Sequence, residues 1–163
     1  MFDFRYKKHN YIYNNLVELS RNKFFYKELN LEDKLENRII LIFAHLSIIL
    51  KLIKKQNKDN SLSQELYDNT FLNLENNIRE MGHGDVTVNK KMKELNRIFH
   101  EILLKFIDKN EKIQPLEICK FFFKNGEVDQ IDVKIKDYFE KYHYFCFDII
   151  NKNMLKDIIN FKF

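Results

Sequence analysis

The histidines of this sequence could in principle bind a metal ion, but their spacing argues against it. They are His9, His45, His83, His100 and His143. Imidazoles and thiolates form metal sites when they recur at short, fixed intervals, as in HExxH or CxxC, and neither pattern is present. The adjacent pair His100 and Glu101 would fall on different faces of a helix. We therefore predict no metal and no other cofactor.

The sequence also lacks the motifs that position a nucleophile or a phosphate group. It has no GxSxG, no phosphate-binding loop and no dinucleotide fingerprint, and Gly82-His83-Gly84 is too short to replace them. Neighbouring carboxylates such as Glu75 and Glu80 could do acid–base chemistry, although on a charged helix they more often form a solvated face. We therefore expect a protein that is not an enzyme.

One short segment concentrates unusual residues. Between Asn76 and Asp85 the chain places Arg79, two acidic residues and two of its three glycines. An Arg in a chain dominated by Lys can hold a bidentate hydrogen-bonding role. The alternative is an ordinary corner, in which Arg79 satisfies the last carbonyls of one helix and Asp85 caps the next. The residues alone leave both interpretations open.

The elements that must position these residues are predicted to be helices, because the chain has only three Gly and one Pro and its apolar residues recur every three or four positions. We expect an all-α protein, a single domain over residues 1–163 built as a bundle of about six to seven helices. The predicted helices span 8–29 (interrupted near Arg21-Asn22-Lys23), 33–55, 61–81, 89–108, 115–125 and 129–150, with a short helix or strand after them.

The second of these helices should be the buried centre of the bundle. Ile39 to Leu50 is the longest uncharged stretch, at twelve residues, which is too short to cross a bilayer. Asp33 and Glu36 have the spacing of a capping box at its start. Gly82 is predicted to adopt the left-handed conformation that ends the third helix. Cys119 and Cys146 form no CxxC pair, so we expect reduced, buried thiols.

The charge of the chain is weaker evidence about its partners than the motifs are. With 28 basic and 24 acidic residues, the formal charge of +4 is compatible with an anionic membrane or RNA, but a solvated mixed surface explains it better. Lys clusters at 51–58 and 90–93 keep one alternative open, a basic helical module that binds RNA or the ribosome. The opening MFDFRYKKHN has neither a signal-peptide nor a transit-peptide pattern.

The segment from Asn76 to Lys93 resembles the signature of the ubiquinol-cytochrome c reductase chaperone family, an MGxGD-like core followed by a basic helix. Further stretches agree in order and in approximate spacing: Ser20–Tyr26, Leu31–Asp33, Asn37-Arg38 and Ala44–Leu46. The similarity covers about residues 11–106, and residues 115–163 share only a helical pattern. This sequence differs from the family at Lys23, Asn37, His83 and His100-Glu101-Ile102.

The resemblance implies a helical assembly factor that binds newly made cytochrome b or another membrane-protein client and helps to assemble the respiratory cytochrome bc complex. It also implies a second small factor and the ribosome as partners, with peripheral membrane contact and no DNA. We expect a bacterial member, located in the cytoplasm or at the inner face of the cytoplasmic membrane.

A chaperone of this kind needs a groove that binds the apolar surface of a client helix, and polar anchors that allow the client to be released. We expect one surface made by the helix from Asp33, the 79–85 corner and the basic residues after it, with Arg38 and Arg79 as anchors and aromatic contacts beside them. Core packing is the alternative for Phe25, Tyr26 and His45. The candidate residues are Phe25, Tyr26, Arg38, His45, Arg79, Glu80, Met81, Gly82, Gly84, Asp85, Lys90 and Lys91.

Overall fold

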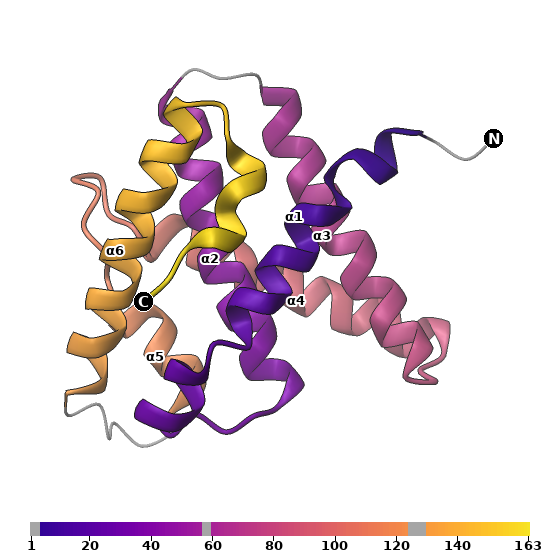
Figure 1. Cartoon of the computed structure of the whole chain (residues 1–163). Coiled ribbons are helices and arrows are strands. Elements are labelled where there is room, and N and C mark those ends of the chain that lie inside the picture. The colour runs from indigo at the N-terminus through magenta and orange to yellow at the C-terminus, as the bar shows by residue number, and fades with distance from the viewer. Residues whose placement is uncertain (1–3, 57–59, 124–129) are drawn as a thin grey trace.

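Helices make up the regular structure of the protein, as the sequence predicted. The computed structural model describes residues 4–56, 60–123 and 130–163, with side chains from residue 11 onward. Within them, an isolated bridge between Ile107 and Ile113 is the nearest approach to a strand. The elements, drawn in Figure 1, are α1 (Phe4–Ser20), the π-helical turn η1 (Phe24–Glu28), α2 (Leu35–Lys55), α3 (Asn60–Glu80), α4 (Asp85–Lys105), α5 (Leu116–Phe122), α6 (Ile131–Asn151) and the 3-10 helix η2 (Leu155–Asn160).

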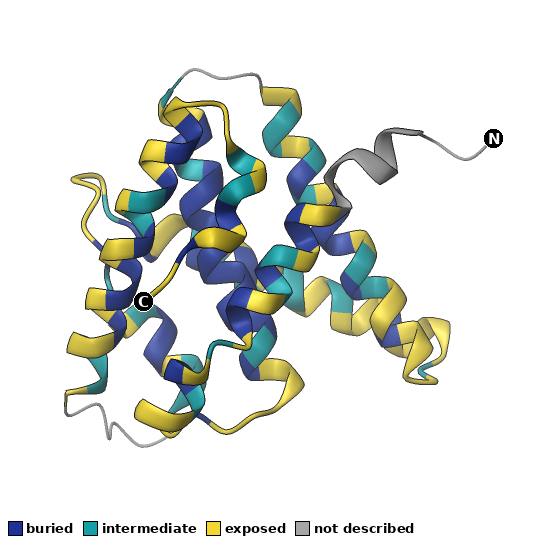
Figure 2. Ribbon diagram, viewed as in Figure 1, coloured by how far each residue is buried: buried dark blue, intermediate teal, exposed yellow. Residues whose placement is uncertain are grey.

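Helix α2 is the centre of the bundle, and this confirms the prediction made from its uncharged stretch. Every residue from Ile39 to Leu50 is buried, so this part of the helix is covered on all sides. Helices α1, α3, α4, α5 and α6 all contact it. Figure 2 shows the buried residues gathered around α2 and the exposed ones on the outer faces of its neighbours. A helix without a polar face requires this central position.

The predicted interruption near residues 21–23 is present and turns the chain into the core. Helix α1 ends at Ser20, and the Asn22 side chain accepts a hydrogen bond from the Phe24 backbone N–H at 3.0 Å. The π-helical turn that follows buries Phe24 and Phe25. The Phe25 ring meets the Tyr138 ring edge-on with centroids 4.7 Å apart, which joins η1 to α6.

The predicted starts of α2 and α4 were wrong in detail, and α1 begins at Phe4, four residues before the predicted residue 8. Asp33 does not cap α2, because the helix begins at Leu35 after an extended Lys34 and its cap has no side-chain hydrogen bond. The Asp33 carboxylate instead accepts two hydrogen bonds from Arg38, at 2.7 and 2.8 Å. Helix α4 begins at Asp85, four residues before the predicted Asn89, because the extended Gly84 is already its N-cap. Asp85 therefore lies in the first turn and is not the cap.

The turn between α3 and α4 has the predicted glycine conformation. Gly82 has a φ of +87°, and its N–H donates to the Arg79 carbonyl oxygen at 2.9 Å. In Figure 1 this turn lies at the far end of the α3–α4 pair, well away from α5 and α6. The turn residues are mostly exposed, although Ile78 and Val88 on either side of it are buried. We call residues 79–86 the α3–α4 tip.

The C-terminal elements close the other side of the core. Helix α6 packs on α2, and η2 packs on both α1 and α6. Both cysteines are free and buried, as predicted. Burial raises the pKa of the Cys119 thiol to about 12 and raises that of Cys146 further. No helix in the described part of the chain is long and apolar enough to cross a membrane.

Candidate functional site

Two of the candidate residues lie in the core. Phe25 and His45 are fully buried, and both pack on the α6 rings of Tyr138 and Phe139. The Nδ1 atom of His45 donates to the Leu41 carbonyl oxygen at 2.6 Å, so its Nε2 atom accepts from the Tyr138 hydroxyl at 2.9 Å. Desolvation lowers the pKa of His45 to about 4 and keeps the ring neutral. These two residues join helices and present no surface to a partner.

Tyr26 and Arg38 lie closer to the surface, where η1 meets the start of α2. The Tyr26 hydroxyl donates to the Ser20 carbonyl oxygen at 2.5 Å, and partial burial raises its pKa. The Arg38 guanidinium is paired with Asp33 and lines a cavity of about 110 Å³ between α1, α2 and α3. Leu35 and Ile39 form its α2 wall. Arg38 therefore sits at the rim of an apolar space.

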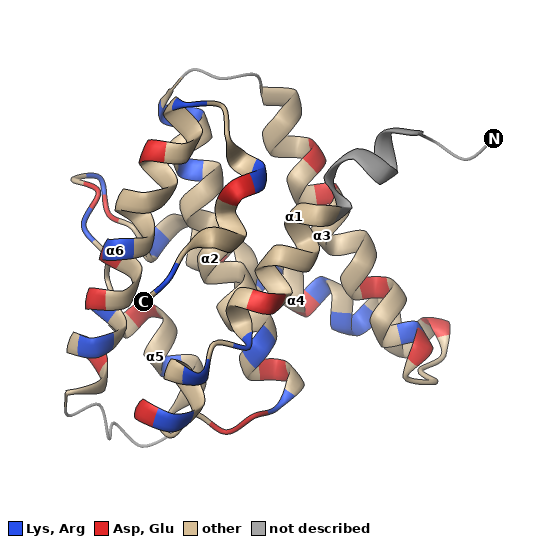
Figure 3. Ribbon diagram, in the orientation of Figure 1, with Lys and Arg blue, Asp and Glu red and all other residues tan. Residues whose placement is uncertain are grey.

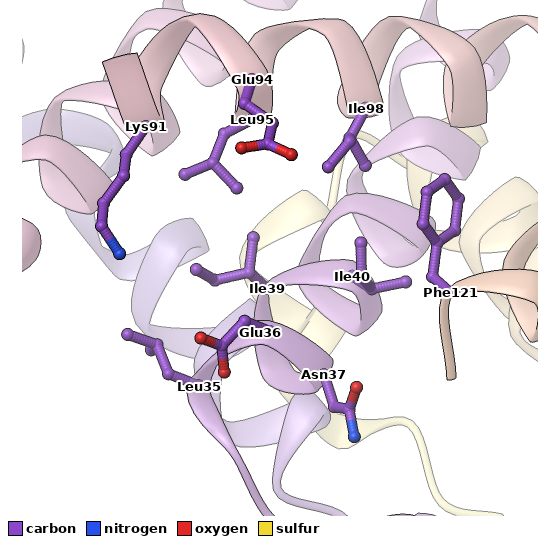
Figure 4. A pocket seen from close by; sticks show the side chains of 10 residues that line it. All are labelled: Leu35, Glu36, Asn37, Ile39, Ile40, Lys91, Glu94, Leu95, Ile98 and Phe121. Atoms are coloured by element: carbon purple, nitrogen blue, oxygen red, sulfur yellow. The ribbon is translucent and has the colours of Figure 1, made fainter. Parts of the chain in front are cut away.

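A larger groove opens on the other side of Leu35 and Ile39. It has a volume of about 290 Å³ and lies between the first turns of α2, the middle of α4 and the end of α5. Figure 4 shows the aliphatic side chains of α2 and α4 facing one another across it, with the Phe121 ring of α5 at one side. The apolar lining residues are Leu35, Ile39, Ile40, Leu95, Ile98 and Phe121. We call this space the α2–α4 groove.

Charged side chains lie at the rim of the α2–α4 groove and not on its floor. Lys91 and Glu94 come from α4, and Glu36 comes from the first turn of α2. The negative Glu36 is favourable at a helix N-terminus, which carries a partial positive charge. In Figure 4 the Lys91 ammonium and the Glu36 carboxylate extend toward the same end of the groove. The arrangement suits an apolar ligand with polar groups at its edges.

The residues of the α3–α4 tip are close to one another but separate from the groove. Arg79 donates to Glu75 at 2.8 and 3.1 Å and also binds the Asp85 carboxylate, and these hydrogen bonds raise its pKa. The guanidinium thus links the last turn of α3 to the first turn of α4. The other tip residues named from the sequence are Glu80, Met81, Gly82 and Gly84, and all are exposed.

The two basic candidates on α4, Lys90 and Lys91, lie on different sides of the helix. Lys91 lines the α2–α4 groove, whereas the neighbouring Lys90 is exposed on a different side of the helix. One continuous surface was expected from the start of α2, the tip and both lysines. Of that surface, the groove brings together Leu35, Ile39 and Ile40 of α2 with Lys91, whereas Arg38 borders the smaller cavity. Lys90 and the tip lie outside the groove.

Sequence reasoning missed the residues that line the groove on α4 and α5. Leu95 and Ile98 share a helix face with Lys91, because residues three and four apart are neighbours on a helix. That spacing was visible, but nothing in it showed which helix they would face. Phe121 follows in a different helix, and only the packing of α5 on α2 and α4 brings it to the groove.

Within the described residues, no group of three or more His, Cys, Asp and Glu side chains is arranged to hold a metal ion.

A family model described as Ubiquinol-cytochrome C chaperone matches residues 27–109, just over half of the chain. No curated protein and no solved structure matches. The matched segment runs from η1 to just beyond α4 and contains every lining residue of the α2–α4 groove except Phe121.

Proposed function

The chain belongs to the ubiquinol-cytochrome C chaperone family, and from this premise we propose that it is a non-enzymatic assembly chaperone that binds newly made cytochrome b. Its role would be to hold this client while the respiratory cytochrome bc complex is assembled. The family match carries the proposal, because it spans α2 and α4, the two helices that face one another across the α2–α4 groove.

We propose that the α2–α4 groove holds an apolar helical segment of the client. A helix binds in a groove by laying its apolar face against aliphatic and aromatic side chains. Ile39, Ile40 and Leu95 supply such a surface, and Phe121 closes one side. A cytochrome b segment outside its bilayer exposes apolar surface of this kind, and burial of that surface is favourable in proportion to its area.

The polar rim would keep this binding reversible. Lys91, Glu36 and Glu94 remain in contact with solvent, and apart from the buried Asn37 the rest of the lining is apolar. Ion pairs at such exposed positions contribute little, typically below about 1 kcal/mol. Affinity would then come mainly from the apolar floor, and the client could leave when its partner subunits offer a larger apolar surface.

The test uses two leucines of almost equal exposure. Leu35, at the groove, is 38% exposed, and Leu72, on α3 outside the groove, is 37% exposed. Leu35→Glu places a carboxylate against the apolar lining, whereas Leu72→Glu makes the same change elsewhere. We expect recovery of cytochrome b with the tagged protein to fall only for Leu35→Glu. Equal recovery with both variants would argue against the groove as the client site.

A further inference from the structure

The outer face of α4 carries a stripe of exposed residues that the groove does not use. Its members follow one another at intervals of four and three residues, which places them on one side of a helix. They are Val86, Lys90, Lys93, Arg97, His100 and Leu104. Val86 and Leu104 are 84% and 75% exposed, and they lie about 27 Å apart along the helix axis. We call these residues the α4 stripe.

The centre of the α4 stripe carries positive charge that the protein leaves largely uncompensated. Among the described residues, no carboxylate lies within ion-pair distance of Lys90 or Lys93. Arg97 reaches Glu101 at only 3.5 Å and keeps 66% of its side chain exposed. In Figure 3 the basic segments of α4 cluster in its N-terminal half, near the α3–α4 tip. This charge is available to an anionic partner.

Two hollows beside the α4 stripe are also lined by basic and apolar side chains. One, of about 570 Å³, has Lys51, Lys54 and His100 around the apolar Phe99, Leu103 and Leu104. The other, of about 440 Å³, is bordered by Lys93, and both share Tyr67 of α3. No Asp or Glu is among the described residues that line either hollow. The face therefore combines cations with aliphatic surface.

We propose that the α4 stripe and these two hollows dock on an anionic phospholipid bilayer. Lysine and arginine side chains attract acidic headgroups, and exposed aliphatic side chains such as Val86 and Leu104 insert at the boundary of the acyl chains. A surface for single-stranded RNA instead uses exposed aromatic rings on which bases stack. The α4 stripe has aliphatic ends, and Tyr67 is partly buried with its hydroxyl bonded to Asn96 at 3.0 Å.

This docking face and the client groove lie on different flanks of α4. Lys91, Glu94 and Ile98 line the groove, whereas Lys93 and His100 border the hollows. Both surfaces could therefore be occupied at the same time. The inference goes beyond the proposed function, and it does not depend on the identity of the client.

The test measures flotation of the full chain with vesicles of phosphatidylcholine, alone or mixed with phosphatidylglycerol. The triple variant Lys90→Gln/Lys93→Gln/Arg97→Gln removes the charge of the stripe. The control variant Lys136→Gln/Lys141→Gln/Lys152→Gln removes three charges from exposed α6 and C-terminal positions. We expect the stripe variant to lose about a hundredfold in partitioning to the mixed vesicles, roughly fivefold for each charge. The control should lose much less.

A second pair of variants tests the aliphatic ends. Val86→Ser/Leu104→Ser should reduce partitioning by about tenfold, because inserted apolar area is lost. Val133→Ser/Leu116→Ser, at comparably exposed positions, should leave it unchanged. Equal loss in both charge variants would overturn the proposal. So would equal binding to vesicles without phosphatidylglycerol, or binding to single-stranded RNA with none to vesicles. Retention of vesicle binding by Leu35→Glu separates this result from the test of the client groove.

Discussion

The Nε2 atom of His45 and the hydroxyl of Tyr138 are 2.9 Å apart in the core, and this hydrogen bond joins the central helix α2 to α6. Because Nδ1 of His45 already donates to the Leu41 carbonyl oxygen, Nε2 is the acceptor and Tyr138 the donor. Tyr138→Phe keeps the ring but leaves a buried acceptor unpaired. We expect a loss of about 1–2 kcal/mol in the free energy of unfolding, measured with urea. An unchanged midpoint and slope would contradict this assignment.

His45 should also make stability depend on pH. Its pKa is about 4 in the folded protein, and its ordinary value is 6.5, so between these values the unfolded chain binds the extra proton. The contribution of the neutral His45 to the free energy of unfolding should therefore be fully present above about pH 6.5. It should be lost as the pH drops toward 4, by about 3 kcal/mol in total. Urea unfolding at several pH values measures this slope.

The control for this prediction is His45→Gln, which removes the buried imidazole. The variant should be less stable at neutral pH, and most of its slope between pH 6.5 and 4 should be gone. Burial also lowers the pKa of the half-buried His143, so a smaller slope of the same sign should remain. A variant that keeps the full wild-type slope would show that other groups control the acid response.

The two described glycines of the α3–α4 tip provide a matched pair. Gly82 has a φ of +87°, a conformation that side chains with a Cβ rarely adopt, whereas Gly84 has a φ of −73° and open space around it. Gly82→Ala should cost about 1–2 kcal/mol in the free energy of unfolding, and Gly84→Ala should be close to neutral. Equal effects in thermal or urea unfolding would show that the left-handed turn is not required.

Much of the fold could be predicted from local sequence features. The uncharged stretch from Ile39 to Leu50 indicated the central helix, the polar residues 21–23 marked the break after α1, and Gly82 indicated the end of α3. Asp33 shows the limit of such reasoning. Its spacing to Glu36 suits a capping box, while its side chain in the folded protein pairs with Arg38. Local spacing alone could not decide between the two partners.

The candidate site was less predictable, because its residues meet only through tertiary packing. The charge of Lys91 predicts a binding role, and the structure places it beside Leu35 and Ile40 from α2. Phe25 has the aromatic character of a contact residue, but the π-helical turn directs it into the core. Sequence patterns identify which face of a helix is apolar, but they do not say whether another helix covers that face.

The role of Arg79 as an anchor for the client stays a prediction that can be tested separately. Its guanidinium binds Glu75 and Asp85 and remains exposed, so Arg79→Ala should leave the helical content measured by circular dichroism unchanged. We expect this variant to recover less cytochrome b than the wild type. The control variant is Arg21→Ala, which removes another exposed Arg, one that pairs with Glu18 at the end of α1. This variant should recover the wild-type amount of cytochrome b. If both variants recover the wild-type amount, Arg79 serves only to hold the turn.

The most direct test of the chaperone assignment is photo-crosslinking in cells that are synthesising cytochrome b. A crosslinking amino acid would be placed at Leu35, at the α2–α4 groove, and at Leu72 as the position of matched exposure outside it. The proposed function predicts a crosslink to newly made cytochrome b from Leu35 and little or none from Leu72. No crosslink to cytochrome b from Leu35, or equal yields from both positions, would contradict it.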